Sequence, residues 1–266
     1  MLSTSFKKLV WDYYKKHGRH DLPWRKTRDP YKILVSEVML QQTQVERVIP
    51  YYEEFVRKFP TPTRLAASPL GSVLTVWQGL GYNRRAKMLW EAARALGKST
   101  FSKHEAHLRV LPGVGPYTAR AIMAFAYNAD VVFIETNIRT AVMHHFFPRK
   151  KNVADAEIEK ILTATLPKGK AREWYSALMD YGAALKRAGV KTNARVKGYT
   201  KQKKFDGSLR QARGAVLRAL VAGPLPSARL TMLLGRDREA QMKGALASLT
   251  KEGLIVLERG EFALPD

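Results

Sequence analysis

The stretch that decides the fold is LPGVGPYTA, at residues 111–119. Gly113 and Gly115 permit close backbone approach and left-handed dihedral angles, because glycine has no Cβ. Pro116 suits the first turn of the small-residue helix expected from Tyr117 to Tyr127. Backbone N–H groups in such a turn can hold a phosphate without reading the base sequence. With the short helix expected before it, the stretch forms a helix-hairpin-helix pattern, which indicates contact with a DNA backbone. The alternative is a tight interhelical turn without a ligand.

The segments on both sides of this motif predict a mainly helical protein. Residues 3–17 place Phe6, Leu9, Val10, Tyr13 and Tyr14 on one helical face, and Gly18 is a natural stop. Two helices joined near Pro50 are expected within residues 30–58, and VVFI at 131–134 is a short buried run. Further helices are expected over 65–79, 84–96, 137–147, 154–165 and 172–187.

The C-terminal quarter differs in character from the rest of the chain. Residues 186–213 carry ten Lys or Arg against one acid, Asp206, which is typical of a basic linker. Helices are then expected over 209–222, 226–234 and 237–252, followed by a hairpin in LIVLERGEFAL that turns at Arg259-Gly260. Three helices and a hairpin are the order of a winged helix, a common DNA-docking module. The hairpin could equally just close a small core.

Composition limits the class of partner. The chain has 46 Lys and Arg against 23 Asp and Glu, a net charge of +23. Such an excess attracts polyanions, and it fits nucleic acid better than an anionic membrane surface. There is no cysteine, which excludes disulfides, thiol catalysis and cysteine-bound zinc or iron–sulfur sites. Because no signal peptide and no apolar stretch of membrane-spanning length is evident, a cytoplasmic, nucleoid-associated location is expected.

Glu37 is the first candidate for chemistry. It lies in YKILVSEVML at residues 31–40, a predicted helix that is apolar nearly all round and therefore expected to be buried. Glutamate is rarely buried without a partner, and loss of hydration favours its protonated form. Such a group suits proton delivery near neutral pH. On periodicity alone, a core ion pair with an arginine explains Glu37 as well.

Three further stretches offer polar groups at predicted turns. QQTQV at 41–45 carries amides that can hydrogen-bond base edges or fill the space left by an extruded base. GLGY at 79–82 offers a flexible turn and an aromatic ring. FIETNIRT places Glu135 where a buried run becomes a helix, so its carboxylate either caps that helix or faces positive charge developing on a sugar, with Asn137 to orient it. Polar helix ends and plain turns account for the first two stretches equally well.

The motifs together resemble the helix-hairpin-helix DNA glycosylase superfamily, and within it the MutY-type adenine glycosylases. The resemblance runs from about Trp24 to Leu185. It depends on the order and spacing of WRKTRDPYKILVSEVMLQQTQVERVIPYYEEF, GLGYNRRA, LPGVGPYTARAI and WYSALMDYGA.

The resemblance implies an all-α, two-lobed fold on double-stranded DNA, with the target nucleotide flipped out of the stack. One lobe is a helical bundle over residues 25–127, and the other combines 1–24 with 128–190. A basic linker (191–207) and the winged-helix-like module (208–266) follow. The implied catalytic residues are Glu37, Glu135, Tyr117 and Asn137. The implied DNA-binding residues are Arg25, Gln41, Gln42, Thr43, Leu80, Tyr82, Gly113, Gly115, Lys201, Lys203 and Lys204.

The implied reaction is hydrolysis of an N-glycosidic bond in duplex DNA. The protein is expected to be a monomer, and no metal or other cofactor is expected because the chain has no cysteine for the family's iron–sulfur cluster. Glu37 protonates the departing base, and Glu135 steadies the cationic sugar. Adenine opposite 8-oxoguanine or guanine is the leading substrate, with mismatched thymine or uracil, or another purine lesion, as the alternative. Bifunctional members have a Schiff-base lysine where this chain has Tyr117, and a phenol cannot form that imine. A non-catalytic DNA-binding or lesion-sensing protein is the rival from another class.

Three departures from the family pattern bear on this interpretation. The family's catalytic aspartate aligns with Glu135, whose side chain is one methylene longer. The four cluster cysteines that the family carries after Tyr181-Gly182 are absent. The family's usual C-terminal domain, which checks for 8-oxoguanine, is replaced by the short module at 208–266.

Overall fold

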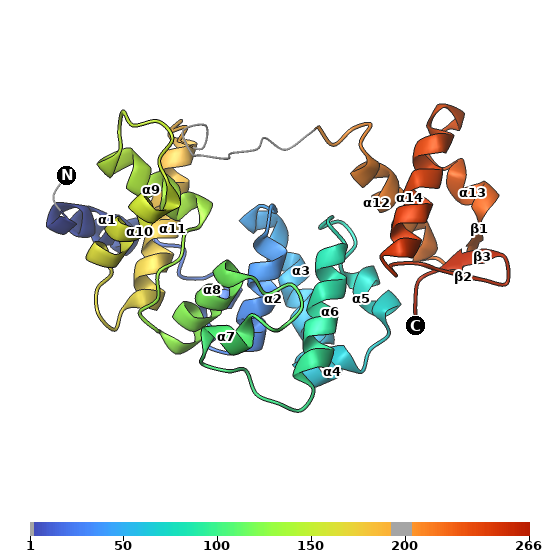
Figure 1. Cartoon of the computed structure of the whole chain (residues 1–266), viewed down its shortest axis with the longest axis horizontal. Coiled ribbons are helices and arrows are strands. Elements are labelled where there is room, and N and C mark those ends of the chain that lie inside the picture. Colours follow the sequence, from blue (N-terminus) through green and yellow to red (C-terminus); the bar gives the residue numbers. More distant parts are fainter. Residues whose placement is uncertain (1–2, 193–203) are drawn as a thin grey trace. The chain divides into compact units, whose positions relative to one another are not determined.

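A computed structural model of the chain describes residues 3–192 and 204–266, so the predicted DNA contacts Lys201 and Lys203 lie outside the described residues. As predicted, the fold is mainly helical, with one small sheet near the C-terminus (Figure 1). The first eight helices are α1 (Ser3–His17), the 3-10 helix η1 (Pro23–Arg25), α2 (Pro30–Leu40), α3 (Val45–Lys58), α4 (Pro62–Ala66), α5 (Leu70–Val76), α6 (Arg84–Leu96) and α7 (Glu105–Leu108). They are followed by α8 (Pro116–Tyr127), α9 (Thr136–Phe146), α10 (Asp155–Thr165) and α11 (Ala171–Arg187).

The described residues form two compact units. The first lies within Met1–Leu34, Ser102–Val110 and Val114–Lys201, and the second within Val35–Phe101, Leu111–Gly113 and Gln202–Asp266. This grouping places α7 and α8 with α9–α11, and the C-terminal module with α3–α6. This grouping by contacts differs from the lobes expected over 25–127 and over 1–24 with 128–190. The expected domain boundaries themselves stay a prediction.

The core of the first unit forms around α11. Trp174 and Tyr175 on this helix are fully buried, and α11 packs most extensively against α9. Phe6 from α1 meets Trp174 edge to face, with ring centroids 6.1 Å apart, and Phe133 lies 4.1 Å from the Tyr175 ring. Such aromatic pairs add to the free energy gained by burial. The face expected of α1 is only partly used, since Leu9 is exposed.

In the second unit, α3 corrects one expectation. Two helices within 30–58 are present, but they are joined at residues 41–44, and Pro50 lies inside α3. A proline in a helix interior usually costs about 3 kcal/mol. Here Pro50 is on the exposed face, while the buried face of α3 runs past it through Val48, Tyr52 and Phe55. Burial of that apolar face outweighs the lost backbone hydrogen bond.

The C-terminal module has the predicted winged-helix order. Its elements are α12 (Leu209–Leu220), β1 (Leu225–Pro226), α13 (Ser227–Thr231), η3 (Arg236–Arg238), α14 (Glu239–Lys251), β2 (Val256–Glu258) and β3 (Glu261–Ala263). The strands pair antiparallel in the order β1-β3-β2, and α12 lies beside α14 (Figure 1). Arg259 and Gly260 both have positive φ, as a tight two-residue hairpin turn requires.

Among the described helices, none is long and apolar enough to cross a membrane.

Candidate active site

Glu37 is buried, as predicted. Its residue surface is 6 % exposed, and Ser36, Val38 and Met39 on both sides of it in α2 are buried as well. A carboxyl group removed from water in this way loses the hydration that stabilises its charged form. The burial of Glu37 is therefore confirmed, and its role in proton delivery stays a prediction.

Arg85 on α6 joins the two loops that were predicted to contact DNA. The residue is buried, with 8 % of its surface exposed. Its Nη1 group donates to three carbonyl oxygens at the end of α2 and just after it, those of Val38 (2.7 Å), Met39 (3.0 Å) and Gln41 (2.6 Å). Its Nη2 group donates to the carbonyl oxygens of Leu80 (3.3 Å) and Gly81 (3.1 Å) and to Thr43 Oγ1 (3.3 Å).

The charge of Arg85 also serves the end of α2. Burial lowers the pKa of Arg85 to about 10, so the guanidinium still carries its charge at neutral pH. A cation beside the last carbonyl groups of a helix complements the helix dipole and satisfies acceptors that the helix itself leaves free. Arg85 therefore stabilises the helix that carries Glu37 as well as the loop that follows it.

Both loops contain a non-glycine residue in the left-handed region. Gln42 has φ of 56° and Tyr82 has φ of 49°. This conformation costs roughly 1–2 kcal/mol for an L-residue, and it persists where the surroundings hold the backbone firmly. Arg85 contacts the residue before each of them, and Trp77 Nε1 donates to the Gly81 carbonyl at 3.1 Å. Contacts from the buried interior thus hold the backbone just before each left-handed residue.

Sequence reasoning missed Arg85, although a signal was present. Arg85 lies four residues before Leu89 and seven before Ala92, both of which are buried on the inner face of α6. A charge at an apolar position of a helix indicates a buried partner. The GLGYNRRA motif drew attention to its turn and its aromatic ring rather than to this arginine.

The helix-hairpin-helix turn confirms one glycine expectation and corrects the other. Gly113 has φ of +76°, and a Cβ there would lie 2.8 Å from the Cβ of Met88, so both its dihedral angle and the close approach require glycine. Gly115 is instead in the extended region, with φ of −83°. It precedes Pro116 at the start of α8, and a Cβ there would contact nothing within 4 Å.

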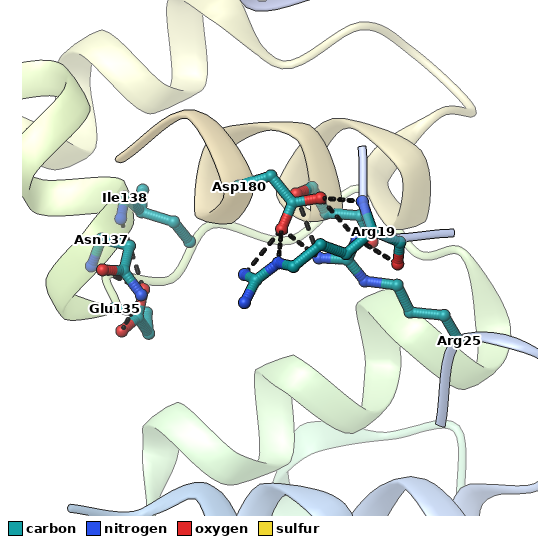
Figure 2. A network of polar contacts seen from close by, with 7 residues as sticks. Arg19, Arg25, Glu135, Asn137, Ile138 and Asp180 are labelled. Carbon is teal, nitrogen blue, oxygen red and sulfur yellow. Dashed lines mark hydrogen bonds and ion pairs between the residues drawn. The ribbon is translucent and has the colours of Figure 1, made fainter. Parts of the chain in front are cut away.

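Glu135 caps α9 in the first unit (Figure 2). Its Oε2 accepts from the backbone N–H groups of Asn137 (2.6 Å) and Ile138 (3.3 Å). Its Oε1 accepts from the Thr136 hydroxyl and from Asn137 Nδ2 (3.2 Å). The structure thus brings Glu135 and Asn137 together as predicted, and it also realises the helix cap that the sequence left open.

The neighbouring helix α11 approaches this cap closely. A Cβ at Gly182 would lie 1.9 Å from the carbonyl oxygen of Asn137, so the two helices can touch here only because residue 182 is glycine. One turn further along α11, burial lowers the pKa of Lys186, and the charge of Glu135 opposes that shift. The Glu135 carboxylate therefore lies within electrostatic reach of an amine.

Arg25 forms an ion pair with Asp180 that the sequence does not predict (Figure 2). Its guanidinium donates to both carboxylate oxygens of Asp180 at 2.6 and 3.0 Å, and to the carbonyl oxygens of Arg19 and Ser176. Burial alone would raise the pKa of Asp180, but the hydrogen bonds and charges of Arg25 and Arg19 hold it below its ordinary value. These contacts engage both Nη groups and leave the side chain 12 % exposed, which gives Arg25 a structural role; its contact with DNA stays a prediction.

The other predicted residues differ in exposure. Tyr117, in the first turn of α8, is half-buried and meets the Phe133 ring edge to face at 5.7 Å. Leu80 is buried, so its side chain is not presented at the surface, whereas Gln42, Tyr82 and Lys204 are exposed. Gln41 and Thr43 are half-buried, and the Thr43 hydroxyl donates to the Gln41 carbonyl at 3.3 Å.

The donor set does not fit the iron–sulfur cluster that the resemblance implies. The chain has no cysteine to supply thiolate ligands. Among the described residues there is also no group of three or more His, Asp or Glu arranged to hold a metal ion.

Comparison with known proteins identifies the family of the chain. A family profile described as "HhH-GPD superfamily base excision DNA repair protein" matches residues 35–168. An adenine DNA glycosylase of Buchnera aphidicola (subsp. Baizongia pistaciae) is 36% identical over 192 residues, 70% of this chain and 54% of that protein. An adenine DNA glycosylase of Mycobacterium tuberculosis (strain H37Rv) is 35% identical over 286 aligned positions, 97% of this chain and 92% of that protein.

Solved structures agree on the fold. A thermostable thymine-DNA glycosylase superposes with a TM-score of 0.60 at 25% identity, over 68% of this chain and 86% of that one. An endonuclease III in a non-covalent DNA complex gives a TM-score of 0.56 at 18% identity, over 67% and 85%. The chain therefore belongs to the HhH-GPD superfamily of base excision DNA repair proteins. Its enzyme class is that of its relatives, DNA N-glycosylase.

Proposed function

We propose that this glycosylase releases adenine mispaired with 8-oxoguanine or guanine from double-stranded DNA and leaves an abasic site. The observation that carries the proposal is the burial of Glu37 in a helix whose end Arg85 holds against the two predicted DNA-contact loops. The names of the Buchnera and Mycobacterium relatives support adenine as the base.

In the proposed reaction, Glu37 protonates the departing adenine. Protonation makes the base a better leaving group, so the C–N bond breaks with less charge left on the base. Loss of the base leaves an oxocarbenium-like sugar cation. A fixed negative charge stabilises this cation. Glu135 supplies that charge, held in one orientation by Asn137 and by the start of α9. Water then adds to the sugar and gives up a proton to the Glu37 carboxylate, which restores the acid.

We propose that the enzyme does not cleave the strand and works as a monomer without a cofactor. Tyr117 offers no amine for a Schiff base with the opened sugar. Lys186 is the reason to test this directly, because it combines a lowered pKa with proximity to the Glu135 charge.

The first test uses duplexes that each contain one defined mispair: adenine with 8-oxoguanine, adenine with guanine, thymine with guanine, and uracil with guanine. Alkali treatment after a single turnover converts each abasic site into a strand break. We expect breaks at adenine with the wild type and a loss of at least about a hundredfold with Glu37→Gln. Glu53→Gln, which changes an exposed glutamate on α3, is the matched control and should cut like the wild type.

The outcomes separate the candidates. Breaks at thymine or uracil but not at adenine would favour a mismatch thymine or uracil glycosylase, a second candidate supported by the superposition on the thymine-DNA glycosylase. Tight binding without breaks, unchanged by Glu37→Gln, would indicate a non-catalytic DNA-binding protein. A covalent DNA adduct after borohydride treatment, absent in Lys186→Gln, would contradict the proposal that the enzyme lacks lyase activity.

A further inference from the structure

The C-terminal module contacts the helical bundle of its own unit at three places. The backbone N–H of Gly71 in α5 donates to the carbonyl oxygen of Pro265 at 2.6 Å. Lys87 Nζ in α6 donates at 2.5 Å to the carbonyl oxygen of Glu252, the residue that directly follows α14. The third contact joins Arg210 of α12 to the loop at residues 79–82. The module therefore contacts the bundle both through α12, where it begins, and through Pro265, near its end.

The third contact is made to Tyr82. Arg210 Nη1 donates to the Tyr82 hydroxyl at 2.6 Å, and the Arg210 guanidinium lies 5.3 Å from the centre of the Tyr82 ring. The guanidinium of Arg85 lies 5.5 Å from the same ring centre. One aromatic ring thus meets one arginine from the bundle and one from the module, both within the range of a cation–π interaction.

The contact with Arg210 reaches a residue whose backbone conformation is energetically unfavourable. Tyr82 is a non-glycine residue with φ of 49°, next to Gly81 with φ of 71°. The loop is partly exposed at Tyr82, so burial alone does not fix the ring. Arg210 is well placed to fix it, because Ser208 caps α12 two residues earlier by accepting from the N–H of Gln211. The backbone position of Arg210 is set by a regular helix, and its guanidinium also lies 5.8 Å from the centre of the Phe205 ring.

We propose that Arg210 is a positioning residue for Tyr82, and that the C-terminal module fixes the shape of the loop at residues 79–82 before DNA binds. The inference rests on the proposed function for its consequence in catalysis, where Tyr82 contacts the DNA stack. It differs from a role in which the module reads the opposite base or merely adds positive charge. The same loop in a chain without the module would sample other conformations.

The first experiment needs no DNA. Hydrogen exchange is measured on the whole chain for the wild type, Arg210→Ala and Arg218→Ala. Arg218 is an exposed arginine on the same helix, so its removal makes the same charge change without touching Tyr82. Two amides report on the loop: Leu80 N–H, bonded to the Trp77 carbonyl, and Arg85 N–H, bonded to the Tyr82 carbonyl.

We expect both reporter amides to exchange about fivefold faster in Arg210→Ala, which corresponds to the loss of one ordinary hydrogen bond. Arg218→Ala should exchange like the wild type. Equal exchange in all three proteins would overturn the positioning role. Because this readout involves no base release, it stands or falls independently of the proposed function.

The second experiment is a double-mutant cycle on single-turnover base release. If Arg210 acts through Tyr82, Arg210→Ala should slow release about tenfold in the wild type and by less than twofold in a Tyr82→Leu background. DNA affinity in Arg210→Ala should fall no further than in Arg218→Ala. Additive effects of the two substitutions, or equal losses with Arg218→Ala, would mean that Arg210 contributes charge alone and would refute the proposal.

Discussion

Replacing Arg85 by methionine should destabilise the second unit strongly. Methionine keeps most of the length and apolar volume of the side chain and removes every donor. Three of the acceptors, the carbonyl oxygens of Val38, Met39 and Leu80, are buried and would lose their charged donor. A buried acceptor left without a partner costs about 1–3 kcal/mol.

The expected loss is smaller than the simple sum of these costs. The remaining acceptors, on Gln41, Thr43 and Gly81, are only partly buried, so water can replace the lost guanidinium there. The loops can also relax from the left-handed conformations at Gln42 and Tyr82, which returns some backbone strain. We therefore expect a decrease of about 3–5 kcal/mol in the free energy of unfolding.

Urea unfolding followed by tryptophan fluorescence measures this change, because the Arg85 guanidinium lies 5.5 Å from the Trp77 ring centre. Arg84→Met is the matched control: it removes the same charge from the adjacent, exposed residue of α6 and should change stability by less than about 0.5 kcal/mol. If the free energies of unfolding of Arg85→Met and Arg84→Met differ by less than about 1 kcal/mol, other contacts hold the two loops and the reasoning is wrong.

Three further predictions concern the first unit. Gly182→Ala brings a Cβ to 1.9 Å from the Asn137 carbonyl oxygen. We therefore expect thermal unfolding to show a decrease of about 2 kcal/mol in the free energy of unfolding, and single-turnover base release to slow. Gly214→Ala is the control and should change neither, because a Cβ there meets nothing within 4 Å. Asp180→Asn leaves two arginines without their carboxylate and should cost about 3 kcal/mol in urea unfolding, while a loss below 1 kcal/mol would show the ion pairs to be dispensable. Burial, with the nearby charge of a second histidine, lowers the pKa of His145 from 6.5 to about 4, so between these values the unfolded chain binds the proton more readily and stability falls as the pH drops. We expect a loss of about 2 kcal/mol between pH 7 and pH 4, and a flatter profile in His145→Phe.

The features that the sequence predicted well are those fixed by neighbouring residues. The hairpin at Arg259-Gly260 is one, because left-handed dihedral angles at both turn positions depend on local sterics alone. The burial of Glu37 is another, because a helix that is apolar on all sides has no face to offer to water. Gly113 belongs here too, although the same argument failed for Gly115, which proline fixes in an ordinary extended conformation.

The features that the sequence did not predict depend on long-range partners. The ion pair of Arg25 is one such feature, because its partner Asp180 is 155 residues away in the chain. Arg85 reaches back over 40 residues to the end of α2. Pro50 is expected near the junction of two helices but lies inside α3, where burial of the apolar face outweighs the local cost of proline. A local sequence pattern contains no information about these distant partners or about which helix face is buried.

Glu135 is the residue at which the helix cap and the proposed chemistry must be reconciled. The resemblance aligns it with an aspartate, and the added methylene gives it a longer reach. In this structure that reach turns back toward α9, where both carboxylate oxygens accept hydrogen bonds from residues 136–138. A carboxylate held by so many donors is a poor nucleophile, because attack would break those bonds. It is well suited to act as a fixed charge, since electrostatic stabilisation requires an orientation that does not change during the reaction. The cap therefore supports the proposed role of Glu135 as a fixed charge rather than as a nucleophile.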